Sequence, residues 1–103
     1  MSITYQIVYW RDIPAQVKVR SGDQRINRPL SPRFQEAIDD AAMRAQATST
    51  DDYLSDWHSS EWQEGQGDAD QLADALVTRL ETEFDAERLR ALKTNEGYQK
   101  KED

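Results

Sequence analysis

The chain of 103 residues has no cysteine, one histidine, four glycines and three prolines. Without cysteine it forms no disulfide and no thiolate metal site, and it has no cysteine nucleophile. A single histidine leaves too few nitrogen ligands for an ordinary zinc site. Gly65-Gln66-Gly67 lacks the lysine and the spacing of a phosphate-binding loop. These absences exclude the most familiar catalytic and cofactor-binding motifs.

The sequence also has no long apolar run. No stretch approaches the ~18 apolar residues of a membrane span. Met1-Ser2-Ile3-Thr4-Tyr5 has neither the basic start nor the apolar segment of a signal peptide. We therefore expect no membrane span and a cytoplasmic location. The length favours one domain, residues 1–95, followed by a flexible charged tail over residues 96–103.

The net charge of −7 is unevenly distributed along the chain. Residues 1–35 carry six basic and two acidic side chains, whereas residues 36–87 carry two basic and fifteen acidic ones. Residues 88–103 carry five basic and three acidic side chains. Because the acidic middle would repel phosphate, we expect no nucleic-acid partner. The acidic segment is either a solvated helical surface or a face for a basic partner.

Three segments near the N-terminus alternate between apolar and polar residues, which predicts strands. Residues 3–10 become apolar on both sides towards Trp10, as in a central strand. Residues 15–20 form a half-exposed strand, and residues 25–30 a weaker one whose Pro29 suits an edge. We predict a three-stranded antiparallel meander. Its outer face is expected to carry a basic patch of Lys18, Arg20 and Arg25.

Helical spacing then predicts two helices before residue 60. Ser31 and Pro32 suit the cap and the first position of a helix that runs to about residue 45. A second, short helix is expected from about residue 50 to Trp57 or His58. The following loop is expected to hold Trp62 as a buried anchor.

A long third helix is predicted from residue 69 to about residue 92. Asp68 suits its cap, and Asn95 with Gly97 suits its end. The expected fold class is thus α+β, a three-stranded antiparallel β-meander followed by three α-helices, the last one long. The first and third helices are expected to cover the sheet.

The lone His58 is the natural starting point for any catalytic or metal site. Serines lie near it in the sequence, but no strand-turn-helix glycine pattern frames them. The nearby acids match no calcium-loop template. These serines and acids are Ser55, Ser59, Ser60, Asp56, Glu61, Glu64 and Asp68. We therefore expect no catalytic residue, no metal and no cofactor.

The turn between the first two strands combines Trp10, Arg11, Asp12 and Pro14. Tryptophan and arginine are frequent interface anchors, so this corner is a candidate recognition site. The alternative is a core tryptophan at the sheet end, with Arg11 paired to Asp12 or stacked on a ring. Nothing in the corner favours catalysis.

Arg28 and Arg33 flank the start of the first predicted helix. Together with the free amides after Ser31 they form a candidate site for a phosphate or carboxylate. The alternative is ordinary capping with solvated arginines.

The run Tyr9–Val17, Tyr-Trp-Arg-Asp-Ile-Pro-Ala-Gln-Val, resembles the hallmark of a small bacterial "virulence factor" domain family. The resemblance covers about Ile3 to Leu92 and extends to the N-terminal part of conserved virulence factor C. It continues through residues 33–39, 41–44, 52–54, Trp57 and residues 84–89. The family implies no established activity and no catalytic residues.

Two functions of different classes are compatible with these patterns. The first is a non-enzymatic protein-interaction module or accessory subunit of a bacterial complex, with another protein as its partner. The second is a small ligand- or anion-binding regulator, or a subunit completing an enzyme site, with contacts from Arg11, Arg28 and Arg33. Whether the chain is a monomer or a homodimer is left open by the sequence.

Overall fold

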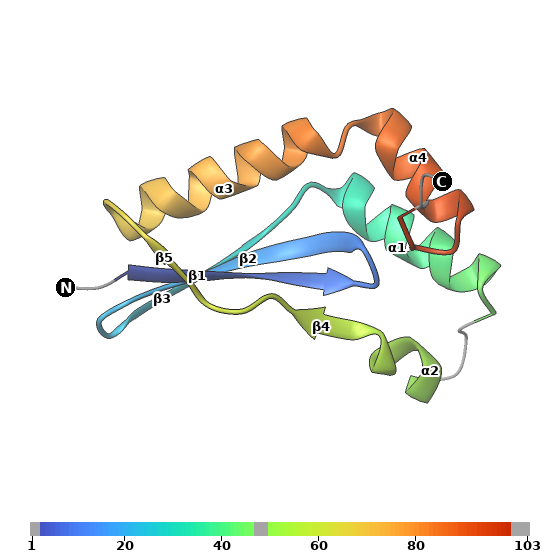
Figure 1. Ribbon diagram of the computed structural model, residues 1–103, viewed down its shortest axis with the longest axis horizontal. Helices are drawn as coiled ribbons and strands as arrows, with labels where there is room; N and C mark the ends of the chain where they lie inside the picture. Colours follow the sequence, from blue (N-terminus) through green and yellow to red (C-terminus); the bar gives the residue numbers. More distant parts are fainter. Residues whose placement is uncertain (1–2, 47–49, 100–103) are drawn as a thin grey trace.

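The computed structural model describes residues 3–46 and 50–99, which form an α+β fold (Figure 1). The predicted fold class is confirmed, with four helices among the described residues instead of three. The elements in chain order are β1 (Ile3–Trp10), β2 (Ile13–Ser21), β3 (Gln24–Pro29), α1 (Pro32–Arg44), α2 (Thr50–Ser55), β4 (Trp57–Ser59), β5 (Gln63–Gly65), α3 (Ala69–Glu83) and α4 (Ala86–Thr94).

The predicted meander forms three strands of a five-stranded sheet with the order β3-β2-β1-β4, and β5 also pairs with β1. The outer edge of β1 is therefore shared: Trp10 lies opposite Trp57 in β4, and Ile3 opposite Gly65 in β5. Between these two strands, Ser60 exchanges hydrogen bonds with the backbone of Ile7 at 2.9 and 3.0 Å. The loop expected before the third helix is thus partly strand. It covers a sheet edge whose backbone groups would otherwise need other partners.

The strand register gives the sheet one apolar and one polar face. Val17 is buried, and Arg28, its neighbour in β3, forms ion pairs with Asp70 and Asp74 of α3. This is the face that α3 covers (Figure 1). The opposite side, which we call the open face, carries polar side chains that are partly or fully exposed: Gln6, Gln16, Lys18, Arg20, Arg25 and Asn27.

The single long third helix is wrong, because the chain breaks between α3 and α4. Phe84 leaves helical geometry with φ −100° and ψ 68°, and Asp85 caps α4 by accepting the amide of Arg88 at 2.8 Å. The break lets Phe84 pack beside Phe34 of α1, with ring centroids 6.2 Å apart. It also turns α4 back along α1, where a straight helix would have projected from the domain (Figure 1).

Two smaller predictions near residue 60 also need correction. The short helix α2 ends at Ser55, so Trp57 and His58 belong to β4. Trp62 is 40% exposed and is therefore no buried anchor. Elsewhere the predicted helix ends are confirmed: Ser31 precedes α1, Asp68 caps α3, and α4 ends at Thr94.

Candidate functional site

Trp10, the centre of the predicted corner, is a core residue with 0% exposure. Its indole Nε1 donates a hydrogen bond to the carbonyl of Tyr53 at 2.9 Å, and the two rings stack at 5.9 Å. Gly97 packs so closely against the Trp10 ring that an added Cβ would lie 2.8 Å from it. Trp10 therefore joins β1 to α2 and to the segment after α4.

Arg11 is also held by contacts within the domain. Its φ of +53° lies in the left-handed region that non-glycine residues seldom adopt. Its Nε and Nη2 each lie 3.1 Å from the Asp56 carboxylate, and its Nη1 donates to the carbonyl of Glu96 at 2.7 Å. The guanidinium lies 4.7 Å from the ring centroids of both Trp10 and Tyr98. Only 13% of the side chain is exposed.

The rest of the corner is also occupied by internal contacts. Pro14 is fully buried, and the exposed Asp12 accepts the amide of Gln99 at 2.6 Å. The Asp12 amide in turn donates to the carbonyl of Gly97 at 2.9 Å. The corner is thus a structural joint. Residues 96–99 belong to it, past the boundary expected at residue 95, and residues 100–103 of the expected tail lie outside the described residues.

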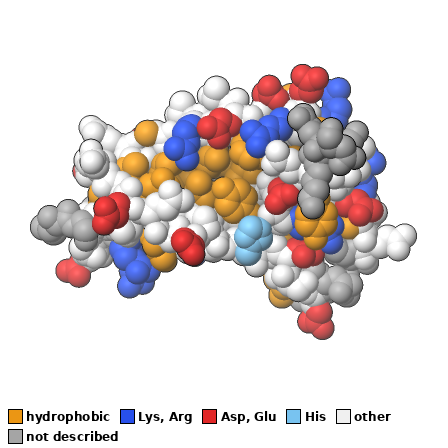
Figure 2. All heavy atoms as spheres, viewed as in Figure 1, with side chains coloured by type: hydrophobic (Ala, Val, Ile, Leu, Met, Phe, Trp, Pro, Cys, Tyr) orange, Lys and Arg blue, Asp and Glu red, His pale blue; other side chains and the backbone are white. Residues whose placement is uncertain are grey.

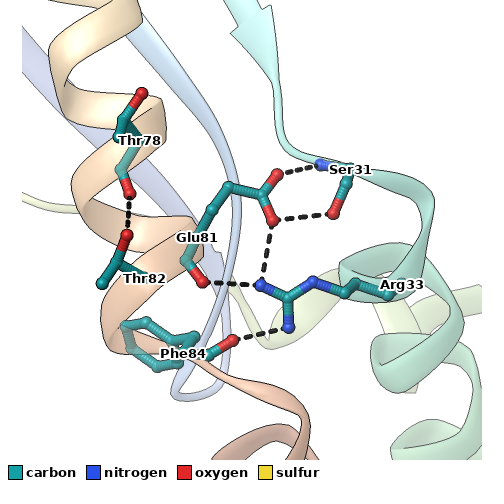
Figure 3. Close-up of polar contacts among 6 residues, drawn as sticks. All are labelled: Ser31, Arg33, Thr78, Glu81, Thr82 and Phe84. Carbon is teal, nitrogen blue, oxygen red and sulfur yellow. Dashed lines mark hydrogen bonds and ion pairs between the residues drawn. The ribbon is translucent and has the colours of Figure 1, made fainter.

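The candidate anion site near Ser31 is filled by a carboxylate of the chain itself (Figure 3). Glu81 of α3 accepts hydrogen bonds from the amide and the hydroxyl of Ser31, both at 2.8 Å. Arg33 donates to the same carboxylate at 2.9 Å and to the carbonyls of Glu81 and Phe84. Partial burial alone would raise the pKa of Glu81, but the Ser31 and Arg33 hydrogen bonds outweigh it and lower that pKa.

Arg28 is neutralised in the same way by the flank of α3 that faces β3. It forms ion pairs with Asp70 at 2.7 Å and with Asp74. Asp70, Asp74 and Glu81 recur at helical spacing, so this flank of α3 supplies the partners of both arginines. That spacing was visible in the sequence and is the signal that would have paired them. Part of the acidic segment is therefore internally compensated.

Lys18, Arg20 and Arg25 remain as a cationic group on the open face. The register places Arg20 directly opposite Arg25, with Lys18 next along the same side of β2, as expected. The Arg20 guanidinium lies 4.5 Å from the ring centroid of Trp62. The three cations belong to the lining of a hollow of about 170 Å³, which we call the cradle; its lining residues are Lys18, Val19, Arg20, Arg25, Asn27 and Trp62.

Within residues 3–46 and 50–99, the cradle cations differ from the other predicted contact arginines in having no carboxylate partner. Among the described residues, Lys18, Arg20 and Arg25 take part in no ion pair, whereas Arg11, Arg28 and Arg33 all do. Sequence reasoning found the three cations but missed Trp62, because a loop tryptophan carries no periodic signal that shows which face it joins. The cradle is thus the part of the predicted site that is free to meet another molecule.

His58 contacts residues of β1 and of the structural joint. Its Nε2 lies 2.6 Å from the carbonyl oxygen of Arg11, and its ring stacks on Tyr9 with centroids 5.5 Å apart. Ser60, one of the serines near it in sequence, uses its hydroxyl to bond the backbone of Ile7 and Glu61. The described part of the chain contains no group of three or more side chains placed to hold a metal ion.

An apolar patch lies on the side of the molecule viewed in Figure 2, below α3 and over β1, with charged side chains along its upper border. Tyr5, Tyr9, Leu72 and Val77 are the partly buried hydrophobic residues that β1 and α3 contribute beside the core. Burial raises the pKa of Tyr9, which Arg79 opposes. Because α3 packs on β2 and β3, it leaves this edge of the core partly exposed.

A second hollow, of about 300 Å³, is lined by residues of α1 and α4. Its charged lining mixes both signs, and Lys93 lies 3.4 Å from Asp40 across it. The charged residues of this lining are Arg33, Glu36, Asp40, Arg90 and Lys93. The mixed charge makes it a weaker candidate for an anion than the cradle.

The fold and the site define a small α+β domain with a buried structural joint and a cationic open face. The chain belongs to the family described as "Virulence factor", whose model matches residues 8–92. The match runs from within β1 into α4 and so confirms the resemblance seen in the sequence. No curated protein and no solved structure matches the chain. None of the described helices is both long enough and apolar enough to span a membrane.

Proposed function

We propose that the chain is a non-enzymatic protein-interaction module, or an accessory subunit of a bacterial complex, that works in the cytoplasm and receives its partner on the open face. The observation that carries this proposal is the contrast between two groups of cations. Arg11, Arg28 and Arg33 are neutralised inside the domain, whereas the cations of the cradle have no ion-pair partner in the described residues.

The surroundings of His58 and of the corner support a non-enzymatic role. The His58 Nε2 contacts a backbone carbonyl, and the corner side chains that looked like contact residues are buried or bonded within the domain. Exposed charge on a rigid sheet suits recognition, because complementary charges steer partners together and fix their register.

Capture from native lysate tests the proposal. The wild-type chain is expected to recover a stoichiometric partner, and the combined variant Lys18→Gln, Arg20→Gln and Arg25→Gln is expected to lose it. Arg90→Gln is the matched control, since Arg90 is also exposed and has no ion-pair partner in the described part of the chain, but lies on α4. Retention of the partner by the combined variant would contradict docking on the open face.

A small-anion regulator is the second candidate, and the size of the cradle favours it. A hollow of about 170 Å³ fits a carboxylate or phosphate group better than a whole cofactor. This candidate predicts no captured protein and a rise of several degrees in melting temperature on addition of a single anionic metabolite. The same combined variant should abolish that rise.

A further inference from the structure

We infer that the cradle recognises an acidic, extended segment of a partner protein, whose carboxylates meet Lys18, Arg20 and Arg25 beside Trp62. This inference rests on the proposed function and names the chemistry of the partner. It is drawn from the register of the cations, the contact between Arg20 and Trp62, and the carboxylates that border the cradle.

The arrangement of the cations includes a repulsion that no carboxylate of the described residues relieves through an ion pair. Arg20 and Arg25 lie directly opposite each other across β2 and β3, where like charges repel. On the other face of the sheet, by contrast, Arg28 of β3 forms an ion pair with Asp70 of α3. A carboxylate brought by a partner would relieve the repulsion between Arg20 and Arg25.

Trp62 orients the Arg20 guanidinium for contact with a carboxylate. The ring lies 4.5 Å from the Arg20 guanidinium, and stacking restrains the plane of that group. No hydrogen bond involving the guanidinium is present among the described residues. Its N–H edge can therefore donate two parallel hydrogen bonds to a carboxylate, the geometry that arginine forms best.

The spacing of the cations favours an extended segment. Lys18 and Arg20 are two residues apart on one strand and point to the same side, which separates them by about 6.6 Å along β2. Acidic side chains at alternate positions of an extended segment have the same separation. A segment with acids at every second position thus matches Lys18 and Arg20 without bending.

The borders of the cradle favour a short protein segment over nucleic acid. Glu64 of β5 pairs with Thr4, which pairs with Arg20, so a carboxylate lies in the same row of the open face. Asp23 lies in the turn beside the Arg20–Arg25 pair. A phosphate chain extending past the cradle would meet these acids on a molecule of net charge −7.

Titration with defined peptides tests the inference. The probe is a short synthetic peptide that alternates glutamate and serine, the control peptide carries glutamine for glutamate, and a single-stranded DNA oligonucleotide represents nucleic acid. Binding is followed by tryptophan fluorescence, to which the exposed Trp62 contributes. The wild-type chain should bind the glutamate peptide, in a salt-sensitive manner, and neither of the other probes.

Single substitutions locate the binding. Arg25→Gln should weaken the affinity for the glutamate peptide about tenfold or more, since a charge-assisted hydrogen bond is lost. Arg25→Lys should retain most of the affinity, and Arg90→Gln should leave it unchanged. Equal affinity of wild type and Arg25→Gln, or preferential binding of the oligonucleotide, would overturn the inference.

Two further outcomes separate this inference from the proposed function. If no glutamate peptide binds but the lysate partner is still lost by the combined variant, the docking surface stands and its acidic occupant is wrong. Self-association of the chain that Arg25→Gln abolishes would instead identify a second copy as the occupant. That result too would overturn the inference.

Discussion

Trp10 and Arg11 are neighbours in the chain that close the end of the sheet by different means. The indole fills the core and satisfies its single donor on Tyr53. The guanidinium, stacked on the Trp10 ring, bonds Asp56 on one side and Glu96 on the other. Together they connect the end of the sheet to the region of α2, through Tyr53 and Asp56, and to the segment after α4, through Glu96.

Removal of the indole should be costly. Trp10→Ala leaves a large cavity and an unsatisfied carbonyl at Tyr53, so we expect the free energy of unfolding to fall by about 3–5 kcal/mol. Urea denaturation of wild type and variant measures this change. A variant that keeps its stability while losing a partner would show that Trp10 acts at an interface.

Glu81 makes stability depend on pH. Its pKa is lowered in the folded chain, with burial opposing and the Ser31 and Arg33 hydrogen bonds prevailing. Its contribution is therefore complete above the pKa of an unfolded glutamic acid and is lost as the pH falls through the lowered pKa. Glu81→Gln should cost about 1–3 kcal/mol at neutral pH.

The comparison of this variant with wild type across pH is the decisive measurement for Glu81. The stability difference between the two chains should shrink in acid, because protonation removes the same charge from the wild type. A difference that stays constant from neutral to acidic pH would mean that the carboxylate charge contributes nothing at this position.

At the scale of elements, the pairing of β2 with β3 carries a repulsive contact. Arg20 and Arg25 are opposite each other, and neither forms an ion pair with a carboxylate of the described residues, so Arg25→Gln should raise the free energy of unfolding by about 0.2–1 kcal/mol. Arg90→Gln makes the same change in net charge and should not raise it. Urea unfolding of both variants checks the prediction, and a less stable Arg25→Gln chain would refute it.

The strongest elements could be predicted because their patterns are long. Period-two alternation located β1 and β2 and placed Lys18 and Arg20 on one side of the sheet. The strands β4 and β5, of three residues each, are too short to show a period, and only the tertiary pairing with β1 defines them.

The helix break escaped sequence reasoning for a different reason. Phe84 continues the three-and-four spacing of α3, so the apolar pattern alone predicts one helix. The break arises from the Asp85 cap and from the packing of Phe84 on Phe34, which depends on where α1 lies. The candidate site was likewise predictable only in part. The strand pattern predicts the positions of its cations, whereas the internal partners of Arg28 and Arg33 depend on how the helices pack on the sheet.

At the scale of the whole molecule, the described basic side chains considered for binding fall into two groups: some form ion pairs inside the domain, and those of the cradle do not. The flank of α3 that faces β3 neutralises Arg28 and Arg33, and Asp56 neutralises Arg11. The cradle cations lie on the opposite side of the sheet from α3. An elongated domain of 44 × 29 × 28 Å thus presents a small cationic surface on an otherwise acidic protein.

Site-specific photo-crosslinking in cells that express the chain natively is the most direct test of whether an acidic partner binds in the cradle. A photoreactive amino acid is placed at position 27, where Asn27 lines the cradle beside the three cations, or at position 90 on α4, and the crosslinked peptides are identified by mass spectrometry. We predict that position 27 captures an acidic segment of one other protein and that position 90 captures none. Crosslinks to a partner from position 90 alone would contradict this prediction.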